Sequence, residues 1–299
     1  MASLKPSLNM PYISSACVKH AKIKDSLIEL SEFGFKSIEL SGGTRPYPEL
    51  KKDLVSLKKD LELNLLLHNY FPPPIKDFVL NLASSNSDIL NSSIDHCKKA
   101  IELSYLLDSK IFGFHAGFYI DILTSEIGKK INAKAINTQE KSLDIFCESY
   151  TELVNFAGKD VKLYVENNVI STENFKSFNE KNPLMLTSVT DYEELSDRID
   201  FNLLLDVAHL KVSCQTLNNN FQSSLQELFS ISDYIHVSDN NGMVDSNNFI
   251  SEESQLYQDL EKLDWEDKTV TIEVYEPLIK VEESMNNLKK LRNARSTNL

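Results

Sequence analysis

The amino-acid sequence predicts an α/β fold, a single closed (β/α)8 barrel that occupies residues 1–299 as one domain. Eight short β-like segments recur along the chain with amphipathic helical segments between them, an alternation typical of parallel sheets covered by helices. Several β-like segments are almost continuously apolar, as expected for parallel strands buried on both faces. An open doubly wound sheet fits six or seven of the units and is the structural alternative.

The predicted strands are short segments spread along the whole chain. They are "PYISSAC" (11–17), "KSIELS" (36–41), "LNLLLHN" (63–69), "KIFGFHA" (110–116), "VKLYVEN" (161–167), "FNLLLD" (201–206), "DYIHVSD" (233–239) and "TVTIEVY" (269–275). The helical segments place apolar residues three and four positions apart. The clearest are 23–35, 47–62, 88–107 and 136–159, and weaker ones lie near 190–198, 221–231, 252–263 and 278–292.

The segments that leave the predicted strands are longer than those that return from helix to strand. The long ones are 69–87, 116–136, 168–189, 207–220 and 238–251. Long loops at one end only are typical of the catalytic face of a TIM barrel. Because glycine is scarce, with 8 residues, we expect asparagine to fill many left-handed turn positions.

Composition and charge narrow the classes of function. The chain has no signal-peptide pattern and no apolar stretch of about 18 residues, so we expect no membrane partner. The cysteines lie far apart without a CxxC pair, which favours free thiols in a reducing compartment, the cytoplasm. The net charge of −13 argues against a nucleic-acid partner, since such proteins need basic surfaces.

Residues that bind metals or move protons stand at the ends of six consecutive predicted strands. They are His68, His115, Glu166, Asp206, His236 and Glu273. A single one has an ordinary structural explanation: a lone histidine is often a hydrogen-bonded core residue, and Asp206 suits a helix N-cap. An ionised carboxylate is costly to bury unless it is paired or coordinated. Brought round a closed ring, the set would converge on one point.

Two glutamates, an aspartate and a histidine form a mixed oxygen and nitrogen ligand set. Such a set favours one divalent ion of the Mn²⁺ or Co²⁺ type, with Zn²⁺ or Mg²⁺ as alternatives. A metal chelated by neighbouring oxygens of a sugar acidifies the C–H beside a carbonyl and stabilises the enediolate that forms. A glutamate on either side can then remove and return the proton.

The segments "LYVENN", "LLLDVAHL", "YIHVSDN" and "TIEVY", in this order, resemble the xylose-isomerase-like TIM-barrel superfamily of sugar isomerases, epimerases, dehydratases and AP endonucleases. The resemblance implies that Glu166, Asp206, His236 and Glu273 hold the metal. It further implies that the two glutamates are the catalytic acid/base pair, and that His209 contacts substrate or a second metal.

The endonuclease branch of that superfamily has additional histidines on earlier strands, which His68 and His115 resemble. It also has an Asp-x-His after the strand-7 histidine, whereas this chain has Asp245 followed by Asn247. The loss of that imidazole weakens a three-zinc cluster and the DNA-repair interpretation. No arginine soon follows His236, where some epimerases contact their substrate.

Further residues are candidates for substrate binding beside His68, His115 and His209. Glu39 closes the second predicted strand. Its carboxylate could bind a substrate hydroxyl or form a local salt bridge, and the sequence favours neither over the other. Lys211 and Arg45 are the basic residues best placed to meet a substrate phosphate or carboxylate. Aromatic side chains on the rim offer ring faces to a sugar, although such residues are more often packing anchors: Tyr70, Phe71, Phe118 and Tyr119.

The leading hypothesis is therefore a metal-dependent sugar isomerase or epimerase of carbohydrate metabolism. Its partner would be a small-molecule sugar or sugar-phosphate, and a homodimer or homotetramer is allowed for. A metal-dependent hydrolase, such as an AP-endonuclease-like phosphoesterase, and a sugar dehydratase are the alternatives on the same site. A third possibility is a non-catalytic barrel that binds a ligand, against which the complete four-ligand set argues.

Overall fold

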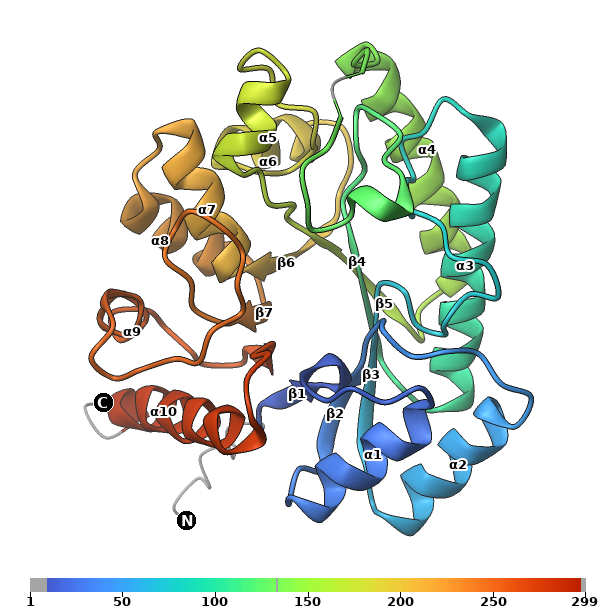
Figure 1. The fold of residues 1–299 in the computed structure, drawn as a ribbon, viewed down its shortest axis with the longest axis vertical. Helices are drawn as coiled ribbons and strands as arrows, with labels where there is room; N and C mark the ends of the chain where they lie inside the picture. Colours follow the sequence, from blue (N-terminus) through green and yellow to red (C-terminus); the bar gives the residue numbers. More distant parts are fainter. Residues whose placement is uncertain (1–9, 133, 297–299) are drawn as a thin grey trace.

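Eight parallel strands close into a barrel in their sequence order, β1 to β8, in the computed structural model of the protein (Figure 1). The structure describes residues 10–132 and 134–296. The strands are β1 Tyr12–Ser14, β2 Ser37–Leu40, β3 Asn64–His68, β4 Ile111–His115, β5 Lys162–Glu166, β6 Asn202–Asp206, β7 Tyr234–Val237 and β8 Thr269–Ile272. Because β1 also pairs with β8, through Ile13 and Ile272, the barrel prediction is confirmed and the open sheet is excluded.

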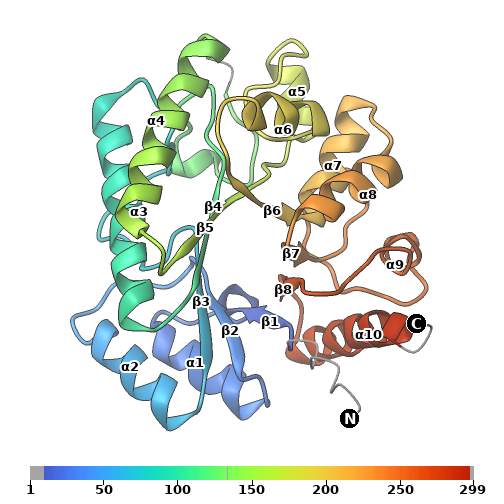
Figure 2. The same cartoon turned by 180° about the vertical axis from the view of Figure 1, so that it is seen from behind.

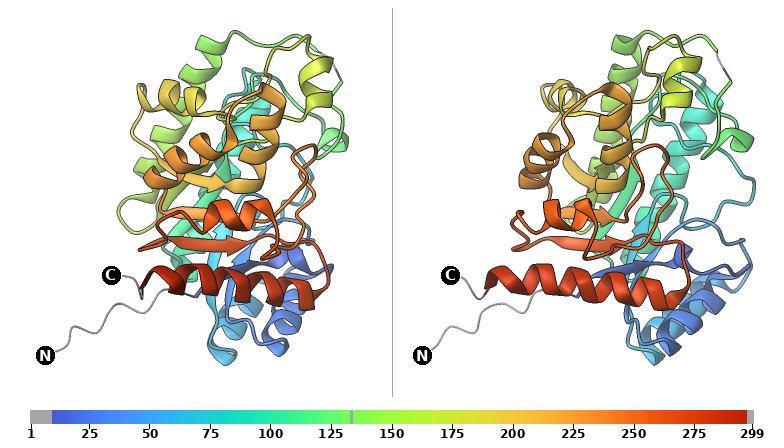
Figure 3. Two further views of the ribbon diagram at one scale, coloured as in Figure 1. Left: turned by 90° about the vertical axis from the view of Figure 1, so that its left-hand side faces the viewer. Right: turned by 60° about the vertical axis from the view of Figure 1, so that its left-hand side comes forward.

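Helices surround the strands on the outside of the ring, as Figures 1 and 2 show from opposite sides. They are α1 Ile23–Glu32, α2 Leu50–Asp60, α3 Ser87–Leu106, α4 Gln139–Ala157, α5 Thr172–Ser177, α6 Val189–Ser196, α7 Val207–Leu217, α8 Phe221–Ile231, α9 Gln255–Leu260 and α10 Leu278–Ser296, with short 3-10 helices η1 Ser15–Cys17 and η2 Thr124–Glu126. Figure 3 shows α10 lying along β8.

The segment 207–220, expected as a loop, is mostly helix, and this expectation was wrong. Asp206 ends β6 and also caps α7, since its Oδ1 accepts a hydrogen bond of 2.7 Å from the backbone N–H of His209. Asn218, with φ 57° and ψ 37°, then ends α7 in the left-handed conformation that asparagine tolerates. One aspartate therefore joins a buried strand to a buried helix without an intervening turn.

The backbone bears out the expected use of asparagine in turns. Positive φ angles occur at Asn69, Asn179, Asn218 and Asn247. Gly34 follows α1 with φ 109°. Asparagine thus replaces glycine at several left-handed positions of a glycine-poor chain.

Strand register sets candidate residues side by side at the ends of neighbouring strands. His115 pairs with Glu166, and Asp206 pairs with His236. Below these strand ends the barrel interior is filled by Leu66, Tyr164, Leu204 and Tyr234. Gly113 makes room for them, because a Cβ at this position would lie 2.7 Å from Leu204 Cδ1.

In the part of the chain that the structure describes, no helix has the length and apolar character needed to cross a membrane. That residues 1–299 form one domain stays a prediction.

Candidate metal centre

Four side chains from β5 to β8 meet at the carboxyl end of the barrel. Glu166, Asp206, His236 and Glu273 each contribute one potential ligand atom, and these atoms all lie within 4.8 Å of one another. Glu166 and His236 have no exposed surface, and Asp206 and Glu273 are almost completely buried. The structure therefore brings together the four residues that the sequence assigned to a metal.

The centre contains polar atoms that a cation would satisfy. Glu166 Oε1, Asp206 Oδ2 and His236 Nδ1 are buried and have no hydrogen-bond partner among the described residues. His236 Nδ1 lies 3.3 Å from Glu166 Oε1 and 3.6 Å from Glu273 Oε2. Buried polar atoms are nearly always paired, and an isolated buried carboxylate is costly. Three carboxylates and one imidazole with free lone pairs fit one divalent ion.

The two glutamates are held ionised by their neighbours. Burial would raise the pKa of Glu166, but the positive charges of His115 and His68 outweigh it and hold that pKa well below the ordinary value. Burial likewise opposes ionisation of Glu273, yet His236 lowers its pKa to about 2.

Asp206 has the opposite electrostatic environment. Burial raises its pKa to about 7, His209 opposes the shift, and the charge of Asp245 adds to it. An added positive charge stabilises the ionised form of such a carboxylate strongly. It stabilises a carboxylate that already has a positively charged partner less.

A second group of ligand atoms lies against the other oxygen of Glu166. His68 Nε2 is hydrogen-bonded to Glu166 Oε2 at 2.8 Å, and His115 Nδ1 lies 3.0 Å from the same oxygen. His68, His115 and Glu166 also have ligand atoms within 4.8 Å of one another. The His115 side chain is 26% exposed, so this group lies nearer the mouth of the barrel.

His209, on α7, stands at the edge of the centre. Its Nε2 lies 3.3 Å from Asp245 Oδ2 and 4.0 Å from Asp206 Oδ2. Its Nδ1 lies 2.9 Å from the backbone carbonyl oxygen of Asn167. Burial would lower the pKa of His209, but Asp206 and Asp245 raise it well above the ordinary value.

Glu39 and Lys211 occupy different surroundings from the other predicted substrate-binding residues. Glu39 is fully buried beneath the centre and is hydrogen-bonded to His236 Nε2 at 3.0 Å. Lys211 donates to Asp239 Oδ1 and to the carbonyl oxygen of Asn240, both at 2.6 Å. Its ammonium group is thus directed to the β7–α9 loop.

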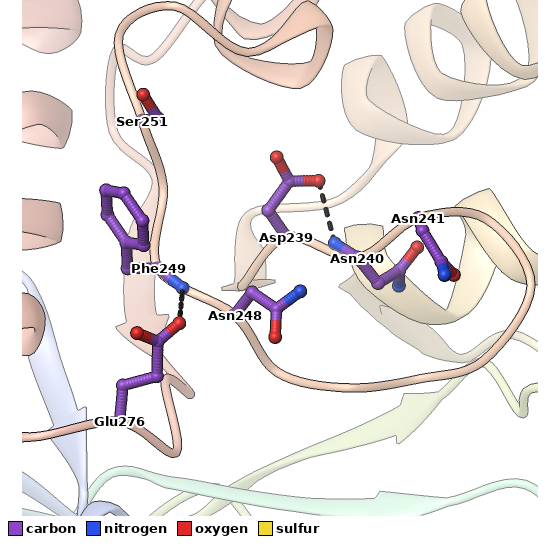
Figure 4. Close-up of a pocket in the computed structure, with 7 residues that line it drawn as sticks. All are labelled: Asp239, Asn240, Asn241, Asn248, Phe249, Ser251 and Glu276. Atoms are coloured by element: carbon purple, nitrogen blue, oxygen red, sulfur yellow. Dashed lines mark hydrogen bonds between the residues drawn. The ribbon is translucent and has the colours of Figure 1, made fainter.

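The loop after β7 borders a pocket of about 390 Å³. Its lining is mostly amide and carboxylate, with one aromatic ring (Figure 4): Asp239, Asn240, Asn241, Asn248, Phe249, Ser251 and Glu276. Asp239 accepts from the N–H of Asn240, and Glu276 accepts from the N–H of Phe249. These contacts fix the two sides of the pocket.

The predicted rim residues are mainly packing anchors. Phe71 is fully buried, and Tyr119 is 6% exposed. Tyr70 accepts a hydrogen bond from the N–H of Leu80. Arg45 is exposed and pairs with Asp77 at 3.3 Å.

Sequence reasoning missed Asn167, which follows Glu166 directly. Its Oδ1 accepts from the N–H of Asp206, and its Nδ2 donates to the Asp206 carbonyl oxygen. It therefore fixes the backbone of Asp206 from the neighbouring strand. The polar pair after β5 in "VENN" was the available signal.

The chain belongs to the xylose isomerase-like TIM barrel family, whose sequence profile matches residues 27–291. The resemblance predicted from the four strand-end segments is thereby confirmed. No curated protein matches the chain.

Similar solved structures cover almost the whole chain. A D-tagatose 3-epimerase-like protein is 20% identical with a TM-score of 0.70, covering 96% of this chain and 100% of its own. D-psicose 3-epimerase from Clostridium cellulolyticum H10 is 14% identical with a TM-score of 0.64, covering 95% and 99%. A Thermus thermophilus protein, TTHB071, soaked with ZnCl₂, is 16% identical with a TM-score of 0.57, covering 94% and 98%. At these identities the similarity shows the fold.

Proposed function

We propose that this protein is a divalent-metal-dependent isomerase or epimerase of a sugar or sugar derivative, acting by proton transfer beside a carbonyl. The observation that carries the proposal is the group Glu166, Asp206, His236 and Glu273, with three of its buried ligand atoms unpartnered among the described residues. The structurally similar sugar 3-epimerases support the same class of substrate.

The proposed acid/base pair is Glu166 and Glu273. Glu166 ends β5 and Glu273 follows β8, three strands further round the ring, so the carboxylates approach the centre from different strands. Their lowered pKa values favour the carboxylate, the form that can take a proton from carbon. The same glutamate can return that proton to the substrate, or the other glutamate, after taking up a proton from solvent, can deliver one to the opposite face.

The ion would supply positive charge to the substrate carbonyl and to the enediolate that forms from it. Glu166, Asp206, His236 and Glu273 would hold it, and their donor set favours Mn²⁺ or Co²⁺, with Zn²⁺ or Mg²⁺ as alternatives.

For the substrate we place an unphosphorylated sugar ahead of a sugar-phosphate. Lys211, the basic residue predicted to meet a phosphate, already has its charge paired with Asp239 at 2.6 Å. A paired ammonium attracts a second anion weakly.

The direct test is exchange of substrate hydrogen with solvent. Protein loaded with Mn²⁺ or Co²⁺ is incubated in deuterated water with a panel of keto-sugars and their phosphates, and deuterium beside the carbonyl is followed by NMR. We expect incorporation with at least one sugar, loss on chelation and recovery on reloading. No incorporation across the panel, with the ion demonstrably bound, would contradict the proposal.

A metal-dependent hydrolase is the second candidate, favoured by His68 and His115 beside Glu166 Oε2 and by the His209–Asp245 contact. Two or three ions per chain by elemental analysis, with cleavage of abasic DNA, would support it. A single ion per chain would favour the isomerase, as the net charge of −13 already does. A sugar dehydratase shares the enediolate, and loss of water from the substrate would reveal it.

We further propose a cytoplasmic location, since the cysteines Cys17, Cys97, Cys147 and Cys214 are all free and thiols persist in reducing compartments. Association into a homodimer or homotetramer stays a prediction.

A further inference from the structure

A buried carboxylate lies beneath the metal centre and gathers donors from two other strands. Glu39, on β2, accepts at Oε2 from His236 Nε2 and from Thr271 Oγ1, each at 3.0 Å, and from the hydroxyl of Tyr234. Its Oε1 accepts from Ser41 Oγ at 3.3 Å. The side chain has no exposed surface, so these protein groups replace its contacts with water.

The contact with His236 determines which ring nitrogen is available to a cation. A histidine that donates its Nε2–H to a carboxylate keeps the lone pair on Nδ1. In this structure Nδ1 is the atom that faces Glu166 Oε1 and Glu273 Oε2, at 3.3 Å and 3.6 Å. It has no hydrogen-bond partner among the described residues. The Glu39 contact therefore favours the ring orientation and tautomer suited to a metal.

Glu39 also lies near the second histidine of the network. His68 Nδ1 is 3.8 Å from Glu39 Oε1, while its Nε2 is hydrogen-bonded to Glu166 Oε2. Glu39 thus contacts the proposed ligand His236 directly. It also lies near His68, which is hydrogen-bonded to the proposed ligand Glu166.

The position of Glu39 does not suit contact with a substrate. It is covered by Tyr234, Thr271 and His236, and both its oxygens have donors. His115, by contrast, has 26% of its side chain exposed at the mouth. The sequence left two roles open for Glu39, binding a substrate hydroxyl or forming a local salt bridge. The hydrogen-bond network favours a local structural role.

We propose that Glu39 is a positioning residue that orients His236 for the metal and raises the affinity of the centre for it. The inference rests on the metal centre of the proposed function. Glu39, His68, His236 and Glu273 also have ligand atoms within 4.8 Å of one another, but both Glu39 oxygens already accept from protein donors, so in this proposal Glu39 acts through His236 and not as a ligand. Partners of this kind typically change metal affinity by about 10- to 100-fold.

The test measures Co²⁺ binding, by calorimetry and by the visible absorption spectrum of the Co²⁺ form, in the wild type and in Glu39→Gln. The amide keeps the size of the side chain but removes its charge and sets an NH₂ group among donors. We expect about 10- to 100-fold weaker binding and a changed spectrum. Glu126→Gln is the matched control, because it neutralises another buried carboxylate, on the β4–α4 loop, and should leave binding within about twofold.

A second variant keeps the test decisive if Glu39→Gln does not fold. Glu39→Asp keeps the charge but shortens the side chain, and we expect binding between that of the wild type and of Glu39→Gln. The double variant Glu39→Gln/His236→Ala should bind Co²⁺ about as weakly as His236→Ala alone. Without His236, Glu39 has no ligand left to orient, so the two effects are not additive.

The outcomes separate this inference from the proposed function. Wild-type protein that binds no divalent ion overturns the metal centre itself. Wild-type protein that binds Co²⁺, with Glu39 variants that bind it equally well, overturns only the positioning role. Unchanged Co²⁺ affinity with a raised KM would make Glu39 a substrate ligand instead.

Discussion

The two halves of the barrel contribute to the site in different ways. The half from β5 to β8 supplies Glu166, Asp206, His236 and Glu273, and three of their ligand atoms have no hydrogen-bond partner in the described chain. The half from β1 to β4 supplies Glu39, which accepts from several donors, and His68, which is bonded to Glu166. His115 is intermediate, since its Nδ1 lies near Glu166 Oε2 yet is also unpartnered.

This difference separates the proposed metal ligands from the residues that support them. Both halves contain buried carboxylate and imidazole groups, so residue type and burial do not distinguish them. Hydrogen bonding does distinguish them at this centre, because Glu166 Oε1, Asp206 Oδ2 and His236 Nδ1 have no partner among the described residues. Glu39, in contrast, accepts hydrogen bonds from several donors. His115 is accordingly the residue of the first half best suited to a second ion.

The largest effect is expected from the proposed acid/base pair. Glu166→Gln and Glu273→Gln should each lower the rate of solvent exchange at the substrate carbon by about 10²- to 10⁴-fold. Exchange and product formation measured at saturating metal separate this loss from weaker metal binding. If only one of the two variants loses exchange, the reaction uses a single base, and Glu166 and Glu273 do not have equivalent roles.

Next in size is the loss of a ligand from the β5–β8 half. Asp206→Asn should weaken metal binding by more than the roughly 100-fold that loss of an outer partner can cause. Asparagine still caps a helix, so α7 is retained and circular dichroism should be unchanged. Calorimetric titration with Mn²⁺ measures the effect, and wild-type affinity in this variant would remove Asp206 from the ligand set.

A smaller effect is expected from the β1–β4 half. His68→Gln removes the imidazole bonded to Glu166 Oε2, and we expect about 10- to 100-fold lower metal affinity with the number of ions per chain unchanged. Elemental analysis and titration together provide the readout. A fall from two ions to one would make His68 a ligand and favour the hydrolase over the isomerase.

The smallest effect on the site is expected from Glu126, outside both halves. The backbone N–H groups of Leu123 and Asn132 lower its pKa to about 2, burial opposes this, and Lys134 assists. Because the folded pKa lies below the ordinary 4.5, its stabilisation is complete above pH 4.5 and is lost as pH falls towards 2. Glu126→Gln should cost about 1–3 kcal/mol at pH 7 and less at pH 3. Urea unfolding at both pH values measures this, and an equal cost at both would refute it.

The sequence predicted the closed barrel and the four converging residues because both depend on local pattern. Apolar segments marked the strands, and a polar residue after each apolar run marked its carboxyl end, as at Glu166 and Asp206. The helix α7 was missed because residues 207–220 were expected to form a loop, although Asp206 was recognised as a suitable helix N-cap. That cap was weighed as an alternative to a role in the metal centre, whereas in the structure Asp206 caps α7 and also faces the centre.

The roles of Glu39 and Lys211 depend on partners distant in sequence. Glu39 meets His236 and Thr271 only after β2 approaches β7 and β8 across the barrel interior. The direction of Lys211 is set by Asp239 on another loop. Tyr234 and Thr271 carried no signal either, because they lie within strands that look apolar.

Asp206 uses its two oxygens separately: Oδ1 accepts from the N–H of His209, and Oδ2 faces the centre. The hydrogen bond to Oδ1 therefore fixes the side chain when the protein folds, and Oδ2 is left directed at the centre. Binding of a cation does not have to order the Asp206 side chain, because folding has already done so. The entropic cost of ordering it therefore reduces the stability of the fold and not the affinity for the cation. Preorganisation of this kind makes a centre selective for ions whose size matches a fixed cage.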